Sequence, residues 1–193
     1  MNDMKPIIAI IGDRHCFSHD HKAQLAAELG TALIDNGYRV MTGGVGSKDN
    51  NPDGVMDFVM KGARDSAHYS SGDIIAIVPG FDPAEASKYA DIILPTGLDI
   101  YRNVITANAD AVIAIGGGAG TLCEMANAWS LRRLIIAYSN VDGWSSKLAG
   151  TAIDNRKRYP NLEDMVWPTE SASQTIRILQ EKLSLYTKRH KSI

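Results

Sequence analysis

The residues of this sequence best suited to chemistry lie in one stretch, where four glycines precede a hydroxyl and a carboxylate. The stretch reads Gly116-Gly-Gly-Ala-Gly-Thr-Leu-Cys-Glu124. Glycine permits positive φ, and it lets the backbone approach a ligand closely because it has no Cβ. If a helix begins where the glycines end, its free N–H groups and its positive dipole end favour an anion, most often a phosphate. The sequence therefore predicts a phosphate-binding turn. Its expected ligand-binding residues are Gly116, Gly117, Gly118, Gly120 and Thr121.

A strand before this turn and a helix after it must position these residues. The segment Ala111-Val-Ile-Ala-Ile115 is short, apolar and partly β-branched, as expected for a strand buried on both faces. From Thr121 to about Leu131, apolar residues recur at helical spacing, so we expect a helix there. Thr121 and Glu124 are three residues apart and should share one face of it near the turn. The alternative is a glycine-rich turn that serves only close packing of helix on strand.

Strand-like and helix-like segments alternate along the rest of the chain. The further expected strands are 6–11, 38–42, 74–78, 90–95, 134–138 and 165–167. The further expected helices are 21–36, 54–67, 83–88, 98–108, 142–153 and a terminal one that Thr169 or Ser171 caps. This alternation predicts an α/β, three-layer Rossmann-like fold with a mainly parallel sheet and helices on both faces.

Glycines also follow the first two expected strands, at Gly12 and at Gly43-Gly44. The carboxyl ends of parallel strands lie at one edge of a sheet, and ligands bind there at a switch in strand order. We therefore expect Gly12, Gly43 and Gly44 to be ligand-binding residues too. The polar segment 47–53 is long for a strand-to-helix connection, which suits a lid or a selectivity loop, and Asp53 is the expected N-cap of the next helix.

The expected helix over 98–108 should bring further polar groups to the same edge. Its predicted buried face consists of Tyr101, Val104 and Ile105. That arrangement leaves Arg102, Asn103 and Thr106 more exposed. We expect Arg102 to pair with a phosphate or a ribose and Asn103 to be a ligand-binding residue.

Composition limits the class of protein. The chain has 193 residues, of which 45% are hydrophobic and 22% charged, enough for one domain with a full core. We expect a single Rossmann-like nucleotide-binding domain over 1–187 and a basic tail over 188–193. The formal net charge of −2 gives no general attraction to nucleic acid or membrane, so neither is an expected partner. Two cysteines and the lack of a signal-peptide or membrane-spanning pattern favour the cytoplasm.

Taken together, these motifs resemble those of the Rossmann-like LOG (Lonely Guy) superfamily, which includes the molybdenum cofactor carrier proteins and is distantly related to the DNA-processing protein A fold. The resemblance covers most of residues 6–155. Its motifs are Thr42-Gly-Gly44, Pro79-Gly80, Thr96-Gly97, Arg102-Asn103 and, most specifically, Gly116 to Glu124. The segment around Gly143-Trp144 is most similar to the carrier-like branch. The resemblance implies a homodimer or homotetramer, with exposed apolar residues of the motif helix as the interface.

The resemblance also implies an activity. In the cytokinin-activating members, an Arg and the last Glu of the motif act in the hydrolysis of a nucleoside 5′-monophosphate to free base and ribose 5-phosphate. The matching residues here are Arg102 and Glu124, which are the implied catalytic residues. Those enzymes have Pro-Gly-Gly where this chain has Gly116-Gly-Gly118, and two glutamates where it has Cys123-Glu124. The carrier branch instead holds a phosphate-bearing pterin without turning it over, which requires the phosphate-binding turn, or phosphate cradle, but no catalyst.

Three functions therefore stay open at this point. The first is binding of a small phosphate-bearing ligand, a nucleotide or a pterin, by a LOG-type carrier that requires no cofactor but could hold a nucleotide or a molybdopterin-type cofactor. The second is a LOG-type phosphoribohydrolase, an N-glycosidic hydrolase in which Glu124 is the acid–base or charge-stabilising carboxylate. The third is a nucleotide sensor in which the ligand regulates an oligomer.

Two other kinds of site are not favoured. His15, Cys16, His19 and His21 are close in sequence and carry metal-binding groups, but their spacing fits no standard metal site, so we expect none. The sequence has no Gly-x-Ser-x-Gly segment of the kind that positions a catalytic serine. Cys123 is expected to be a small buried residue of the motif helix.

Overall fold

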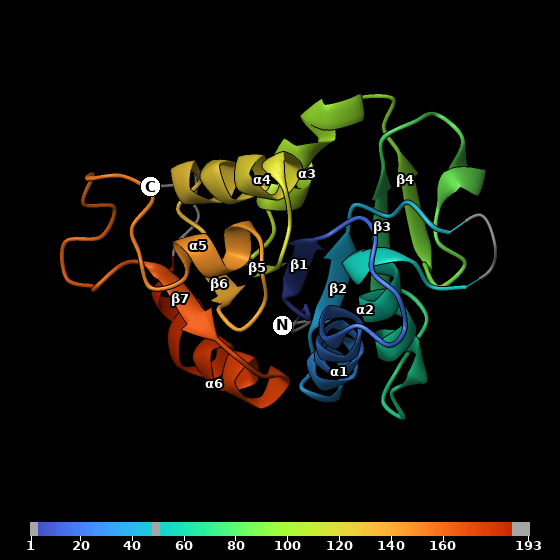
Figure 1. Ribbon diagram of the computed structural model, residues 1–193, viewed down its shortest axis with the longest axis horizontal. Coiled ribbons are helices and arrows are strands. Elements are labelled where there is room, and N and C mark those ends of the chain that lie inside the picture. The colour runs from blue at the N-terminus through green and yellow to red at the C-terminus, as the bar shows by residue number, and fades with distance from the viewer. Residues whose placement is uncertain (1–3, 48–50, 187–193) are drawn as a thin grey trace.

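Seven parallel strands form one sheet in the order β4-β3-β2-β1-β5-β6-β7 (Figure 1). The structure is a computed structural model and describes residues 4–47 and 51–186; residues 48–50 of the expected lid and the basic tail over 188–193 lie outside this range. The strands are β1 (Ile7–Gly12), β2 (Arg39–Thr42), β3 (Ile74–Val78), β4 (Ile92–Pro95), β5 (Ala111–Ile115), β6 (Leu134–Tyr138) and β7 (Val166–Thr169). The order of strands reverses at β1, which pairs with β2 on one side and with β5 on the other.

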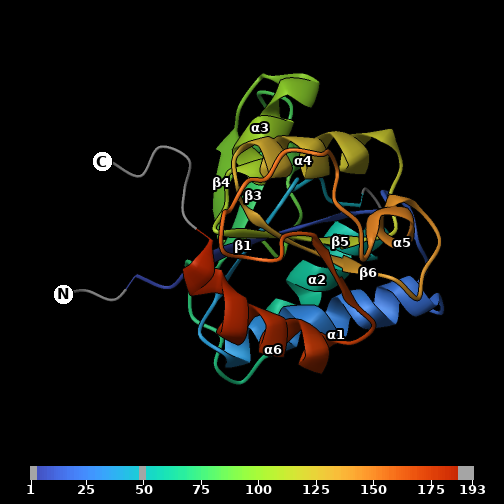
Figure 2. The ribbon, with the colours of Figure 1, turned by 90° about the vertical axis from the view of Figure 1, so that its left-hand side faces the viewer.

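Helices cover both faces of the sheet, as Figures 1 and 2 show. One face carries α1 (His21–Asp35), α2 (Gly54–Asp65) and α6 (Ala172–Lys182), and the other carries α3 (Asn103–Ala107), α4 (Ala119–Ser130) and α5 (Trp144–Leu148). The alternation of side chains along β1 explains the two cores. Ile8 and Ile10 pack into the cluster with α1, α2 and α6, whereas Ala9 and Ile11 pack into the cluster with α4. The structure thus confirms the predicted three-layer α/β fold with a parallel sheet.

Several predicted ends of elements are confirmed. The strand expected at 74–78 is β3, and α1 ends at Asp35, where Asn36 and the positive-φ residue Gly37 follow. Ser171 caps α6, because its side chain accepts a hydrogen bond from the Gln174 N–H. Asp53 does lie at the N-cap position of α2, but its side chain makes no capping bond.

Three expected helices are shorter than predicted. The segment 83–88 forms only the 3-10 turn η1 (Pro83–Glu85), and 98–108 divides into η2 (Asp99–Arg102) and the short helix α3. Of the expected 142–153, only α5 is helical. Gly143 and Gly150 adopt positive φ on either side of α5, and the Gly150 N–H donates to the Val166 carbonyl, so the backbone leaves the helix toward β7.

The predicted buried face of 98–108 is wrong. Tyr101, Val104 and Ile105 are 75%, 47% and 40% exposed, whereas Asn103 and Thr106 are 8% and 0% exposed. The reason is that α3 packs its polar side against α4 at the carboxyl edge of the sheet. Nothing within the described residues covers its apolar side.

No helix in the described ranges combines the length and the apolar character needed to cross a bilayer.

Candidate functional site

The candidate site lies at the carboxyl ends of β1, β2 and β5, where the strand order reverses. Gly116 and Gly117, which follow β5, have φ values of +68° and +94°, a region that side chains strongly disfavour. We call Gly116 to Gly118 the glycine turn. It leads directly into α4, whose first residue is Ala119. The predicted order of strand, glycine turn and helix is therefore present, with α4 starting two residues earlier than expected.

The protein itself binds the first two N–H groups of the glycine turn. Gly116 N–H donates to Ser145 Oγ at 2.8 Å, and Gly117 N–H donates to Asp13 Oδ1 at 3.1 Å. In return, the N–H groups of Trp144 and Ser145 donate to the carbonyls of Gly117 and Gly116. These bonds fix the shape of the turn from two sides. They also occupy N–H groups that a ligand would otherwise use.

The N-terminal end of α4 is open by contrast. Gly118, Ala119 and Gly120 are exposed, and a Cβ added at Gly118 or Gly120 would meet nothing within 4 Å. No side chain of the described residues caps this helix end. The unbound N–H groups of the first turn of α4 and its positive dipole end therefore face accessible space, which favours an anion.

Two of the other predicted glycines, Gly12 and Gly44, lie in close contact with neighbouring parts of the protein. A Cβ at Gly12 would lie 2.3 Å from the Ile115 carbonyl oxygen, and one at Gly44 would lie 2.8 Å from the Ala76 Cβ. These two glycines allow close approach within the sheet edge. Thr121 is also internal, since it is 3% exposed and its Oγ1 donates to the Gly12 carbonyl at 3.3 Å.

Gly43 makes room for Arg102. A Cβ at Gly43 would lie 2.6 Å from Arg102 Nη1, so only glycine permits the guanidinium to lie there. Arg102 Nη1 also approaches Glu124 Oε1 of α4 to 3.8 Å, and the two side chains are only 14% and 10% exposed. The structure thus brings together Gly43, Arg102 and Glu124, which come from three separate segments. Asn103 is buried next to Arg102 at the start of α3.

Burial sets the charge of this pair. It raises the pKa of Glu124 to about 7, although the positive charge of Arg102 acts in the opposite direction. Burial also lowers the pKa of Arg102, against the attraction of Glu124 and Asp99. A carboxyl with a pKa near 7 can donate or accept a proton at neutral pH. The pair can therefore offer a ligand either a cation or a proton donor.

The sequence analysis missed Asp13, Lys22 and Ser145. Lys22 Nζ pairs with Asp13, which holds the glycine turn, and with Asp142 at 2.7 Å. Asp13 directly follows the glycine at the end of β1, a position that could have drawn attention to it. Ser145 lies 29 residues beyond Gly116, and no sequence signal connects the two.

The structure does not group His15, Cys16, His19 and His21 as the ligands of a metal ion. His15 Nδ1 lies 2.8 Å from Asp53 Oδ2, and Cys16 is buried, with its pKa raised to about 11 by burial and by nearby carboxylates. In the described part of the chain, no group of three or more His, Cys, Asp or Glu side chains is placed to hold a metal ion. The prediction for Cys123 is wrong, since this residue is exposed on the solvent side of α4.

Comparison with known proteins gives the same family that the motifs suggest. The model of the SLOG cluster4 family matches residues 5–166. An uncharacterized protein of Archaeoglobus fulgidus is 32% identical over 122 residues, which are 63% of this chain and 72% of that protein.

Two solved structures are similar over nearly their whole length. The molybdenum cofactor binding protein of Rippkaea orientalis is 28% identical, with a TM-score of 0.72 over 93% of this chain and 98% of that one. The molybdenum cofactor carrier protein of Chlamydomonas reinhardtii is 25% identical, with a TM-score of 0.70 over 93% and 99%. These matches confirm the predicted resemblance to the LOG superfamily and its carrier proteins.

The raised pKa of Glu124 predicts how stability depends on pH. Its folded-state pKa of about 7 exceeds the ordinary value of 4.5, so the folded protein loses stability as pH rises between these values. Glu124→Gln keeps the shape but has no carboxylate to ionise. From pH 5 to pH 8, we expect Glu124→Gln to gain roughly 2–3 kcal/mol in unfolding free energy relative to the wild type. Urea denaturation at both pH values measures this, and an equal pH dependence of the two proteins would contradict it.

Proposed function

Because this chain belongs to the SLOG cluster4 family, we propose that it binds a phosphate-bearing nucleotide or a molybdopterin-type cofactor at the N-terminal end of α4, as a carrier. The observation that carries the proposal is that the two halves of the glycine motif differ in their contacts. Gly116 and Gly117 have their N–H groups bound by the protein, while Gly118 to Thr121 present a helix end with open space above Gly118 and Gly120. A phosphate fits such an end in size and charge.

Arg102, which lies near this helix end, also supports a phosphate-bearing ligand. Arg102 Nη1 is buried and has no hydrogen-bond partner among the described residues, so it retains a donor for an oxygen of a phosphate or ribose. The backbone of Gly118 to Thr121 would hold the phosphate and Arg102 a second oxygen. Two relatives of similar fold are named for binding or carrying the molybdenum cofactor. When bound, such a cofactor would supply redox chemistry for another enzyme, while this chain holds it.

A second candidate function rests on Glu124. Its pKa of about 7 and its burial beside Arg102 suit a proton donor to the base that leaves a nucleoside 5′-monophosphate. The products would be the free base and ribose 5-phosphate. A phosphoribohydrolase would use the same phosphate-binding helix end, so the two functions differ only in whether the bound nucleotide is hydrolysed.

An oligomer is also part of the proposal. Apolar side chains are exposed along the edge strand β4 and on the outer side of η2 and α3, a surface that we call the β4–α3 surface. It consists of Phe81, Ile92, Leu94, Leu98, Ile100, Tyr101, Val104 and Ile105. We propose that copies of this chain cover it in a homodimer or homotetramer, since large apolar side chains exposed together on neighbouring segments often mark an interface. The family resemblance points instead to exposed apolar residues of the motif helix, which is a separate prediction. A ligand-dependent change of this oligomer would be the signature of the sensor alternative.

Some expectations from the sequence stay predictions. These are the cytoplasmic location, the lack of a nucleic-acid partner and the extent of the single domain over 1–187.

The cradle itself can be tested at Gly118. Gly118→Val adds a branched side chain where there is open space and an ordinary negative φ, so the fold should persist while the phosphate is excluded. We expect it to weaken binding of AMP, or of a phosphorylated pterin, by about tenfold or more. Isothermal titration calorimetry measures this. Ala84→Val, which adds the same kind of side chain on the exposed turn η1, is the matched control. Unchanged affinity in Gly118→Val would refute the placement of the phosphate.

Turnover separates the carrier from the hydrolase. The carrier proposal predicts that the pure protein incubated with AMP or a cytokinin monophosphate releases no free base at enzymic rates. Chromatography of the reaction measures the base. Release that is lost in Glu124→Ala but kept in the exposed control Glu181→Ala would overturn the carrier proposal in favour of the phosphoribohydrolase.

The oligomer can be tested by light scattering. A double change, Tyr101→Lys with Val104→Glu, places charges in the β4–α3 surface and should reduce the mass to that of the 20.9 kDa monomer. Leu185→Glu, which changes a half-exposed apolar residue elsewhere, should leave the oligomer intact. A wild-type protein that is already monomeric at micromolar concentration would contradict the proposal.

A further inference from the structure

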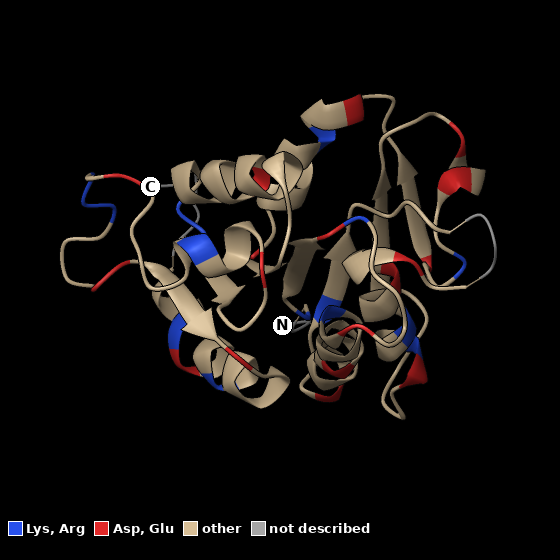
Figure 3. Cartoon of the chain, in the orientation of Figure 1, with Lys and Arg blue, Asp and Glu red and all other residues tan. Residues whose placement is uncertain are grey.

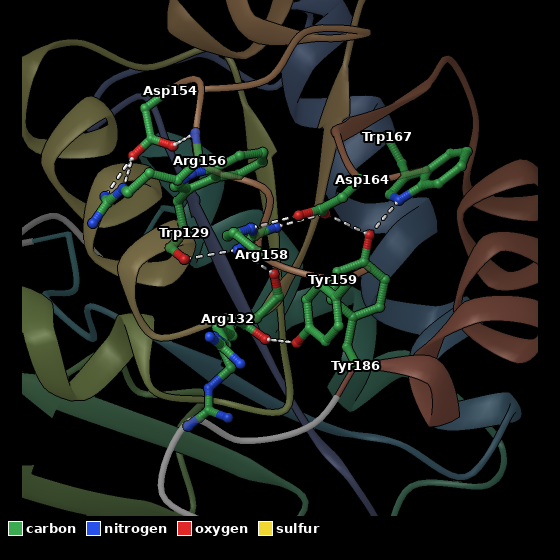
Figure 4. Close-up of polar contacts among 10 residues, drawn as sticks. Trp129, Arg132, Asp154, Arg156, Arg158, Tyr159, Asp164, Trp167 and Tyr186 are labelled. Carbon is green, nitrogen blue, oxygen red and sulfur yellow. Dashed lines mark hydrogen bonds and ion pairs between the residues drawn. The ribbon is translucent and has the colours of Figure 1, made fainter. Parts of the chain in front are cut away.

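The end of α4 that lies away from the glycine turn borders a cavity of about 210 Å³. Figure 4 shows four of its lining residues, Trp129, Arg132, Arg156 and Arg158. Four of its six lining residues are cationic. The lining consists of Trp129, Ser130, Arg132, Arg156, Lys157 and Arg158. The 12 residues of α4 separate it from the glycine turn by about 18 Å, so one small ligand cannot occupy both places.

The positive charge of this cavity is only partly balanced. Asp164 accepts two hydrogen bonds from Arg158, at 2.6 and 2.7 Å, and Asp154 accepts one from Arg156 Nε at 2.7 Å. Within residues 4–47 and 51–186, Arg132 and Lys157 have no ion pair. Lys157 lies on the loop between α5 and β7, where Figure 3 shows Lys and Arg side-chain positions in blue, and Arg132 lies just beyond the end of α4. Two positive charges thus remain available at the cavity.

The end of α4 does not need these two charges for its own stability. Arg158 lies 3.5 Å from the centre of the Trp129 ring, and its Nη1 donates to the Trp129 carbonyl at 2.7 Å. This buried guanidinium already places a positive charge on a carbonyl at the negative end of the helix. Tyr159 fixes the wall further, because its hydroxyl donates to the Arg132 carbonyl at 2.7 Å.

Arg132 occupies a backbone position that favours glycine. Its φ is +58°, its N–H donates to the Trp129 carbonyl, and the next N–H, of Arg133, donates to the Ala128 carbonyl. This is the Schellman ending of a helix, in which the left-handed residue is usually glycine. An arginine here is unfavourable for the backbone, yet this arginine is one of the residues that line the cavity.

We propose that this cavity is a second anion site, which binds a phosphate-sized oxyanion, either free or as the end group of a small phosphate ester. Guanidinium groups bind such oxyanions in a bidentate manner, and Lys157 adds a point charge. The concave shape and small volume favour a compact group over a nucleic-acid backbone, which requires an extended row of cations. The site is independent of the ligand proposed at the glycine turn.

The test uses Gly118→Val as the starting protein, so that the glycine turn contributes no phosphate binding. Inorganic phosphate, glycerol 3-phosphate and a single-stranded DNA oligonucleotide are titrated by calorimetry. We expect one of the two phosphate compounds to bind, and Arg132→Gly or Lys157→Gln to weaken it by about tenfold or more. Arg132→Gly should keep or increase the melting temperature, because glycine suits the positive φ. Arg177→Gln removes an exposed charge from α6 and is the matched control, with unchanged affinity expected.

The outcomes separate the sources of the anion and the ways in which the proposal can fail. Tighter binding of glycerol 3-phosphate than of phosphate assigns the site to a phosphate ester, and the reverse assigns it to the free ion. Binding of the oligonucleotide alone, no binding of either phosphate compound, or equal affinity in Arg132→Gly would overturn the proposal. Phosphate binding that Arg132→Gly removes from the Gly118→Val protein would support this site. The proposed function is judged separately, because it fails if Gly118→Val binds AMP or a phosphorylated pterin as well as the wild type does.

Discussion

The hydrogen bonds that Asp13 and Ser145 accept from the glycine turn are the constraint on which the rest of the site depends. They hold Gly116 and Gly117 in a backbone conformation that places the first turn of α4 at the switch point of the sheet. Lys22 balances the charge of Asp13, and the backbone of α5 closes the turn from the other side. Because these contacts are all made within the protein, they can hold the turn in this shape without help from the proposed ligand. Preorganisation of this kind spares a binding protein the cost of ordering its site.

The polar pair beside the cradle follows from the same arrangement. α4 begins at the turn and carries Glu124 about one and a half helical turns later, while the missing side chain of Gly43 lets Arg102 reach it. Burial then keeps Glu124 poised between its two protonation states near neutral pH. A carrier and a hydrolase can share this construction, since both need a cation near a phosphate and differ in whether a proton is delivered.

Much of the fold could be predicted from the sequence, because buried parallel strands and glycine turns are local signals. The order of strand, turn and α4, and the grouping of Gly43, Arg102 and Glu124 near it, follow from such signals and from the family resemblance. The buried face of α3 could not be predicted, since periodicity does not tell whether an apolar side is covered by the same chain. Asp13 and Ser145 were missed because their roles depend on contacts 104 and 29 residues away in sequence.

The measurement closest to the central claim is mass spectrometry of the small molecule that the protein retains through purification. The account predicts a phosphorus-containing nucleotide or pterin, released on denaturation at close to one molecule per chain and absent from Gly118→Val. A retained molecule without a phosphate, or a phosphate compound that Gly118→Val binds equally well, would contradict the claim that the N-terminal end of α4 is the ligand site.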